Sequence, residues 1–157
     1  MEDLRVLFFL HIVEAFLMTI TGLRLFGYKG NIKIYLSIGL IHGIIVWSVR
    51  GVYLHYHIPF GTHTLILLAI YYLLVKTISK VSWGTALGAA LVSFSLVLIG
   101  GVVSGVLVQS LHLNMGDIVN NPWLHVLVGY SENVFLVLLL IVNVIYGFTL
   151  NTVDSSV

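Results

Sequence analysis

The sequence predicts an all-α integral membrane protein, a bundle of five transmembrane helices. The chain has 157 residues, of which 59% are hydrophobic and 8% charged, whereas soluble domains carry about 25% charged residues. Its apolar residues fall into five stretches, each close to the roughly 20 residues that a helix needs to cross a bilayer. These stretches lack the alternation expected of the shorter strands of a membrane β-barrel.

The five helices are expected in the order 4–25, 34–52, 62–78, 83–109 and 133–150. Since no Pro/Gly/Ser-rich linker interrupts residues 1–150, we expect a single membrane domain, followed by a short tail over 151–157. The longest connection precedes the fifth helix. Pro122 lies where helices commonly begin, and Trp123 is typical of the membrane interface. We therefore expect a short interfacial helix around 122–130.

Lysine and arginine positions predict the orientation. Five basic residues fall on one side of the expected bundle and two on the other: Arg24, Lys29, Lys33, Lys76 and Lys80 against Arg5 and Arg50. Since cytoplasmic loops carry the excess of basic residues, the N-terminus is expected outside and the C-terminus inside the cell. The N-terminal residues MEDLR begin with acidic charges and no cleavage site follows, so the first span is expected to be retained.

The first span contains His11 and Glu14, which share one helix face because they are three residues apart. A carboxylate in mid-membrane costs about 2.5–3.5 kcal/mol, so Glu14 should face other helices. His42, in the middle of the second span, is a candidate partner, since Gly39 and Gly43 beside it permit close helix approach. Two interpretations stay open: a sensing or ligand-binding cluster, or a polar clamp that fixes helix packing.

Further polar side chains follow at the outer end of the second span and beyond it. We expect this outer entrance to be formed by Arg50, His55, His57 and His63. His55 and His57 alternate, which is a chelating spacing, but nothing fixes a third ligand. We therefore expect neither a metal site nor a cofactor.

The fourth span has small residues spaced four apart, which let helices pack closely within one chain or between two copies. The pairs are Gly84 and Gly88, Gly100 and Ser104, and Gly101 and Gly105. In the fifth span, Asn143 is suited to a hydrogen bond across a helix contact. The sequence thus allows a homodimer as well as an internally packed bundle.

Several function classes are disfavoured. The chain has no cysteine, which excludes disulfides and thiolate chemistry. It shows no phosphate-binding lysine loop, GxSxG, HExxH or EF-hand pattern. The net charge of +1 gives no basic surface for nucleic acid. No residue is assigned a catalytic role.

Four segments together resemble a known family: VEAFLMTITGLRLFG (13–27), IPFGTHTLILL (58–68), SWGTALGAALVSF (82–94) and NNPWLHVLVGYSENVFLVLLL (120–140). They resemble the N-terminal multi-span membrane (sensor) region of bacterial sensor histidine kinases with a GHKL-type ATPase and a sporulation-phosphotransferase-like core. The most specific parts are IPFGTHT and NPWLH. The resemblance implies a two-component signalling protein in the bacterial plasma membrane.

The kinase core itself is absent from these residues, and none of the histidines lies in a cytoplasmic helix beyond the membrane. We therefore expect no kinase activity, but a sensor domain that passes a signal from the bilayer or the outer side to a cytoplasmic kinase core or response pathway. Its partners would be the lipid bilayer and a second copy.

Three rival functions remain open: a small transporter or substrate-binding membrane subunit, a membrane enzyme with His11 and Glu14 as acid and base, and a structural or regulatory subunit. A closed bundle with Glu14 against His42 would favour a sensor or scaffold. A ligand-sized cavity that reaches Glu14 would favour binding or transport.

We predict that Glu14→Gln alters helix packing or signal response and leaves membrane insertion intact, because the amide keeps the shape of the side chain and removes its charge. Thermal unfolding in micelles and extraction of the membrane fraction measure the two effects. A Glu14→Leu chain with unchanged stability and unchanged signalling would contradict a role for this carboxyl group.

Overall fold

The computed structural model describes residues 3–56, 58 and 62–150. Within these residues the chain is helical and contains no strand, which confirms the predicted all-α class. The elements are α1 (Leu4–Val6), a π-helical turn η1 (Leu7–His11), α2 (Ile12–Leu25), α3 (Ile32–His55), α4 (Thr62–Ser79), α5 (Trp83–Ser110), α6 (Met115–Asn120), α7 (Pro122–Glu132) and α8 (Val134–Tyr146). The predicted tail over 151–157 lies outside the described residues.

Four helices are long and apolar enough to cross a membrane: Leu4–Leu25, which joins α1, η1 and α2, and then α3, α4 and α5. A fifth span exists only if α7 and α8 are taken together, and these two helices meet at a bend of 46°. The chain thus has four to five candidate spans among the described residues.

The predicted fifth helix, 133–150, differs from the structure in length, because α8 ends at Tyr146 and has 13 residues. The expected interfacial helix around 122–130 corresponds to α7, which leads directly into α8. Asn133 lies at the junction. Its side-chain Nδ2 donates to the carbonyl of Gly129 and its backbone N–H to the carbonyl of Tyr130, and these bonds end α7 before α8 begins.

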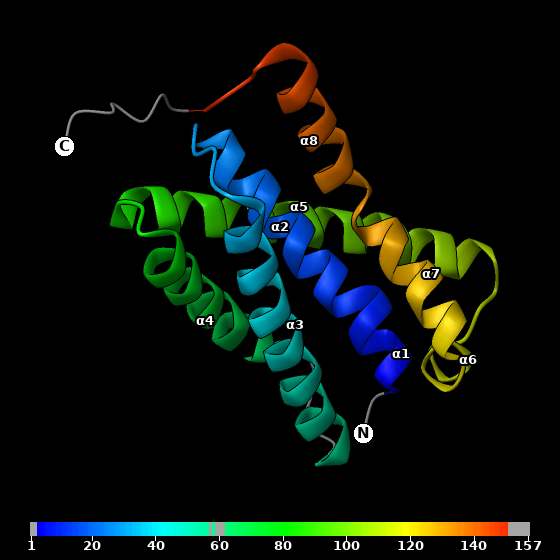
Figure 1. Ribbon diagram of the computed structural model, residues 1–157. Helices are drawn as coiled ribbons and strands as arrows, with labels where there is room; N and C mark the ends of the chain where they lie inside the picture. Colours follow the sequence, from blue (N-terminus) through cyan, green and yellow to red (C-terminus); the bar gives the residue numbers. More distant parts are fainter. Residues whose placement is uncertain (1–2, 57, 59–61, 151–157) are drawn as a thin grey trace.

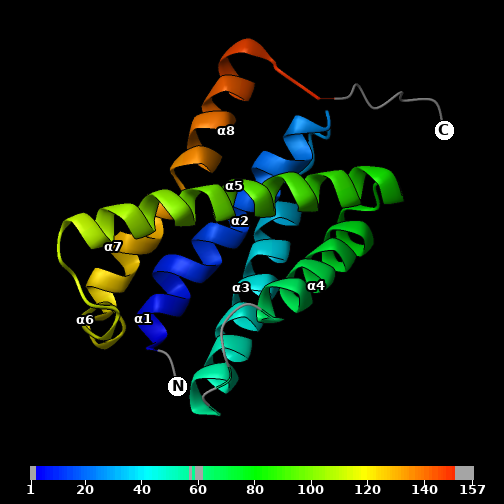
Figure 2. The same ribbon diagram turned by 180° about the vertical axis from the view of Figure 1, so that it is seen from behind.

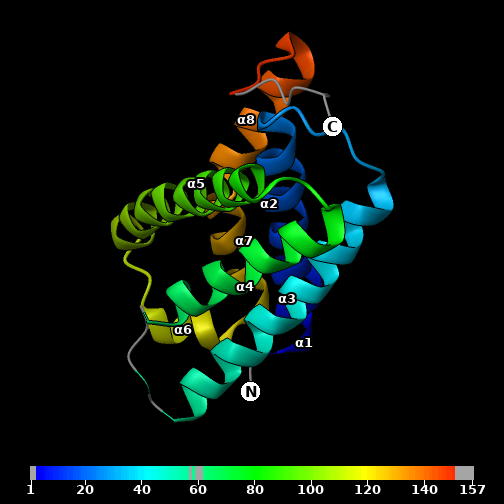
Figure 3. The same cartoon turned by 90° about the vertical axis from the view of Figure 1, so that its left-hand side faces the viewer.

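The first long helix lies at the centre of the molecule (Figure 1), and α2 contacts α3, α5 and α8. Helix α3 runs beside it, and α7 and α8 follow one another along its other flank. Helix α5 crosses these helices at a steep angle, as Figure 2 shows from behind. Figure 3 shows α4 and α5 diverging from the short turn that joins them.

Glycines permit the closest helix contacts. A Cβ atom on Gly43 of α3 would lie 2.8 Å from the Cα of Ile12, and one on Gly39 would lie 3.0 Å from the Cα of Phe16. The close approach expected on either side of His42 is therefore present. Gly22 of α2 likewise faces the backbone of α5, where an added Cβ would lie 2.7 Å from the carbonyl oxygen of Ala89.

The small residues predicted to pack in α5 fall into two groups: some contact other parts of the chain, and the others have no close neighbour. Gly88 contacts the ring of Phe26, Gly100 contacts the backbone of Glu132, and Ser104 donates a 3.3 Å hydrogen bond to the carbonyl of Val128. In contrast, Gly101 and Gly105 have no neighbour within 4 Å of an added Cβ, and Gly84 has only Ser82, at 4.0 Å. One half of the pattern therefore packs within the chain, and a homodimer stays a prediction.

Hydrogen bonds tie the end of α2 to the end of α8. The Arg24 Nε donates to Asn143 Oδ1 at 3.0 Å, and Asn143 Nδ2 donates to the carbonyls of Arg24 and Phe148. The backbone N–H of Leu150 donates to the carbonyl of Leu25 at 2.6 Å. Asn143 thus makes the cross-helix contact expected of it, and the chain leaving α8 is attached to α2. We call this set the α2–α8 clasp.

We predict that Gly100→Ala destabilises the fold by about 1–3 kcal/mol, because the added methyl group overlaps the Glu132 backbone and forces the two helices apart. Gly105→Ala on the same helix is the matched control. It meets no neighbour and should be neutral or stabilising, since alanine favours helix. Reversible unfolding in mixed micelles measures both, and equal stabilities would contradict the packing described.

Candidate functional site

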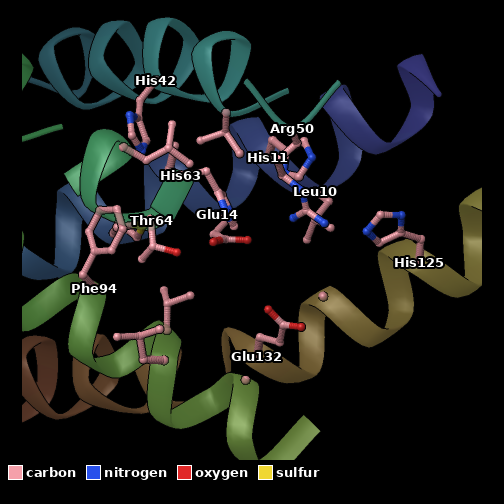
Figure 4. A pocket seen from close by; sticks show the side chains of 18 of the residues that line it. Leu10, His11, Glu14, His42, Arg50, His63, Thr64, Phe94, His125 and Glu132 are labelled. Atoms are coloured by element: carbon pink, nitrogen blue, oxygen red, sulfur yellow. The ribbon is translucent and has the colours of Figure 1, made fainter. Parts of the chain in front are cut away.

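A cavity of about 420 Å³ lies where the central helix meets α3, α4, α5 and α7. This volume is within the range of about 300–1,000 Å³ typical of small-molecule sites. Its polar lining, most of which Figure 4 shows facing a common space, consists of His11, Glu14, His42, Arg50, His63, Thr64, His125 and Glu132. The remaining wall is mainly apolar, so the cavity combines ionisable groups with hydrocarbon surface.

The first helix brings two of these side chains to the cavity through an irregular turn. His11 ends the π-helical turn η1, and Glu14 follows in the first turn of α2. A π-helical turn holds one more residue than an α-helical turn and recurs at functional sites. His11 is buried and Glu14 half-buried, so the carboxyl group faces the interior of the bundle, as expected from its insertion cost.

Two carboxyl groups and one guanidinium determine the electrostatics of the cavity. Glu14 on α2 and Glu132 on α7 point into the same space from opposite sides, and Arg50 of α3 lies beside them (Figure 4). The two carboxyl groups interact electrostatically with each other and with Arg50, and Arg50 also acts on His63. The lining therefore holds two carboxyl groups and one guanidinium besides its four histidines.

His42 is the least exposed of the polar residues that line the cavity. Its side chain is 1% exposed, and its ring centroid lies 4.9 Å from that of Tyr71 and 6.4 Å from that of Phe94. Its Nδ1 atom has no hydrogen-bond partner in the part of the chain that the structure describes. His42 and Glu14 line the same cavity, and a direct pair between them stays a prediction.

The structure groups five of the seven candidate residues in this one cavity: His11, Glu14, His42, Arg50 and His63. His55 lies elsewhere. It is exposed near the end of α3, packs edge-on against Tyr56 and borders a separate shallow pocket with Trp47 and Val52. His57 lies outside the described residues. Among residues 3–56, 58 and 62–150, no group of three or more histidine or acidic side chains is placed to hold a metal ion.

Three polar lining residues were missed by the sequence reasoning: Thr64, His125 and Glu132. Two of them lie on α7, which was interpreted as an interfacial helix. The signal was available, since His125, Gly129 and Glu132 recur at the spacing of one helix face. Because Gly129 has no side chain, the side chain of Leu10 packs directly against the backbone of α7. This contact holds α7 against the first helix.

Comparison with known proteins gives no relative: no protein-family model, no curated protein and no solved structure matches the chain. The resemblance to kinase sensor regions therefore stays a prediction.

We predict that Arg50→Met lowers the free energy of unfolding by about 3 kcal/mol, because it removes the guanidinium that faces two carboxyl groups in a poorly solvated site. Adding Glu14→Gln to this variant should recover part of the loss, which appears as a coupling energy in a double-mutant cycle. Lys29→Met, in an exposed connection, is the control. If the effects of Arg50→Met and Glu14→Gln on the free energy of unfolding were strictly additive, the electrostatic grouping would be contradicted.

Proposed function

We propose that the chain is a membrane-embedded sensor domain that binds a small ligand in the polar cavity and passes a change in helix packing to a cytoplasmic output. The observation that carries the binding part of this proposal is the cavity itself, in which ionisable side chains from four helices face a ligand-sized space. A cavity that reaches Glu14 favours binding or transport, and the α2–α8 clasp is what favours a sensor. Ionisable groups at membrane depth are expensive and usually functional. A closed scaffold would have no use for such a space.

The α2–α8 clasp supports a signalling output. Glu14 and Arg24 belong to the same helix, α2, about three turns apart. The cavity residue lies near one end of the helix and the clasp at the other, where Leu150 bonds to Leu25. A ligand that favours one packing of α2 would shift the segment leaving α8, provided that its affinity differs between the two packings. In the kinase family that the chain resembles, the cytoplasmic core follows the membrane region.

The second candidate function is a small transporter or a substrate-binding membrane subunit. It is favoured by the two carboxyl groups that face the cavity, since intramembrane carboxyl groups commonly mark ion and proton pathways. The two functions differ in one respect: a transporter opens its site alternately to both sides, whereas a sensor changes its packing and needs no flux.

An experiment that fills the cavity separates them. The chain has no native cysteine, so Thr64→Cys, on the cavity wall, can be labelled with benzyl methanethiosulfonate. A sensor should respond with several-fold faster or slower hydrogen exchange at the Leu150 amide in the clasp. Leu65→Cys is the matched control, because the neighbouring Leu65 is 71% exposed and points away.

The outcomes are distinct. Altered exchange at Leu150 with label at position 64 but not at 65 supports a sensor. Unaltered exchange, together with solute or proton flux into liposomes that labelling at 64 abolishes, supports transport and overturns the sensor proposal.

We also propose a plasma-membrane orientation with the N-terminus outside and the C-terminus in the cytoplasm, from the distribution of basic residues. We predict that Leu111→Cys, after α5, reacts with an impermeant maleimide in intact cells, and that Lys29→Cys reacts only after permeabilisation. Both positions are exposed. The reverse pattern would invert the orientation and place the clasp outside.

A further inference from the structure

We infer that the cavity binds an amphipathic ligand with a single protonated amine, whose ammonium group lies between Glu14 and Glu132 and whose apolar part lies against α5. This inference rests on the proposed binding function and specifies the chemical class of the ligand. It follows from the charge, the apolar wall and an unsatisfied buried side chain, which are taken in turn.

The two carboxyl groups of the lining suit a ligand with one cationic group. Glu14 and Glu132 face one another across the space, and the guanidinium of Arg50 interacts electrostatically with both carboxyl groups. Since two carboxyl groups face the cavity beside one guanidinium, a ligand with one ammonium group would meet an acidic partner there. An ammonium donates three hydrogen bonds and can therefore bridge two carboxylates. A second cationic group on the ligand would be repelled by Arg50.

The part of the wall that α5 forms suits an apolar body. Helix α5 contributes Phe94, Val97, Leu98 and Val102 to the cavity, and α4 adds Leu67. These side chains have no hydrogen-bonding groups, so a polar ligand body would lose its hydration there without compensation. A hydrocarbon body instead gains free energy from burial.

His42 is the independent sign that the cavity accepts a ligand. It is 1% exposed and lines the cavity, and its Nδ1 has no partner among the described residues. Buried polar atoms in native proteins nearly always have a partner. A hydroxyl or amide group on the ligand would satisfy this nitrogen. The class is thus an apolar amine with one further hydrogen-bonding group, as in the N-terminus of a short apolar peptide.

The test uses the full chain in phosphatidylcholine nanodiscs, with ¹³C-methyl methionine. Met18 lines the cavity and is 3% exposed, so its methyl resonance reports occupancy. The probes are octylamine, 1-octanol and octanoate, which share a chain and differ in charge. We expect octylamine to shift the Met18 resonance saturably, with at least about tenfold higher affinity than the other two, since hydrogen bonds between charged groups are the strongest.

Glu14→Gln and Glu132→Gln should each weaken octylamine binding by about tenfold and reduce the preference for octylamine over octanol. Glu14→Asp keeps the charge and should keep the preference for the amine, and it serves if a glutamine variant unfolds. Asp117→Asn, an exposed carboxyl group of α6 outside the cavity, is the matched control and should bind octylamine normally.

Two failures are distinguishable. If octanol or octanoate binds as well as octylamine, or if both glutamine variants bind octylamine normally, the amine assignment is wrong and the binding function stands. If none of the three probes shifts the Met18 resonance, the binding function fails, and the amine assignment fails with it.

The ammonium group has more than one source, and two further arms distinguish them. A trileucine amide that binds while its N-acetylated form does not indicates a peptide N-terminus. A Met18 shift on exchanging phosphatidylcholine for phosphatidylethanolamine, with loss of octylamine binding, indicates a lipid headgroup. Both results support the shared chemistry, and binding of the N-acetylated peptide with equal affinity overturns it.

Discussion

The cost of charge at membrane depth governs this structure. Glu14 and Arg50 lie within long, mainly apolar helices, and Glu132 lies at the end of α7. A charged group facing hydrocarbon is unfavourable, so the helices that carry these residues have to turn them towards one another. The cavity is the result: three helices contribute one charged side chain each, and α4 and α5 close the remaining sides. The arrangement that makes the site is thus the arrangement that allows the helices to be buried in a bilayer.

Much of the fold could be predicted from the sequence, because the controlling physics is local. The length of an apolar run and its flanking residues set each long helix, and the bounds of α4 and α5 lie close to those expected. Two features depend on tertiary contacts instead. The bend at Asn133 follows from hydrogen bonds back to α7, and the steep crossing of α5 follows from where Gly22 and Gly100 allow backbones to meet. The spacing of small residues marks Gly100 as a packing position without identifying the segment that it contacts, and the bend at Asn133 has no signature in composition or periodicity.

The candidate site, like the fold, could be predicted from the sequence only in part. Polar residues inside long apolar runs stand out, and the structure gathers His11, Glu14 and His42 around one space. Glu132 was missed because it lies in a segment of mixed composition, where a carboxyl group is unremarkable. Its importance depends on α7 folding back onto the first helix, through Leu10 at Gly129. His55 illustrates the opposite error: a position next to other histidines in the chain does not place a side chain in the cavity.

Gly100 also affects the geometry of the candidate site. It contributes nothing to the cavity lining, yet its missing side chain is what allows α5 to touch the backbone of Glu132. The separation of the two carboxyl groups is therefore set from outside the cavity, by the depth to which α7 settles on α5. Substitutions at position 100 would therefore widen the space between Glu14 and Glu132 without changing any residue that lines the cavity.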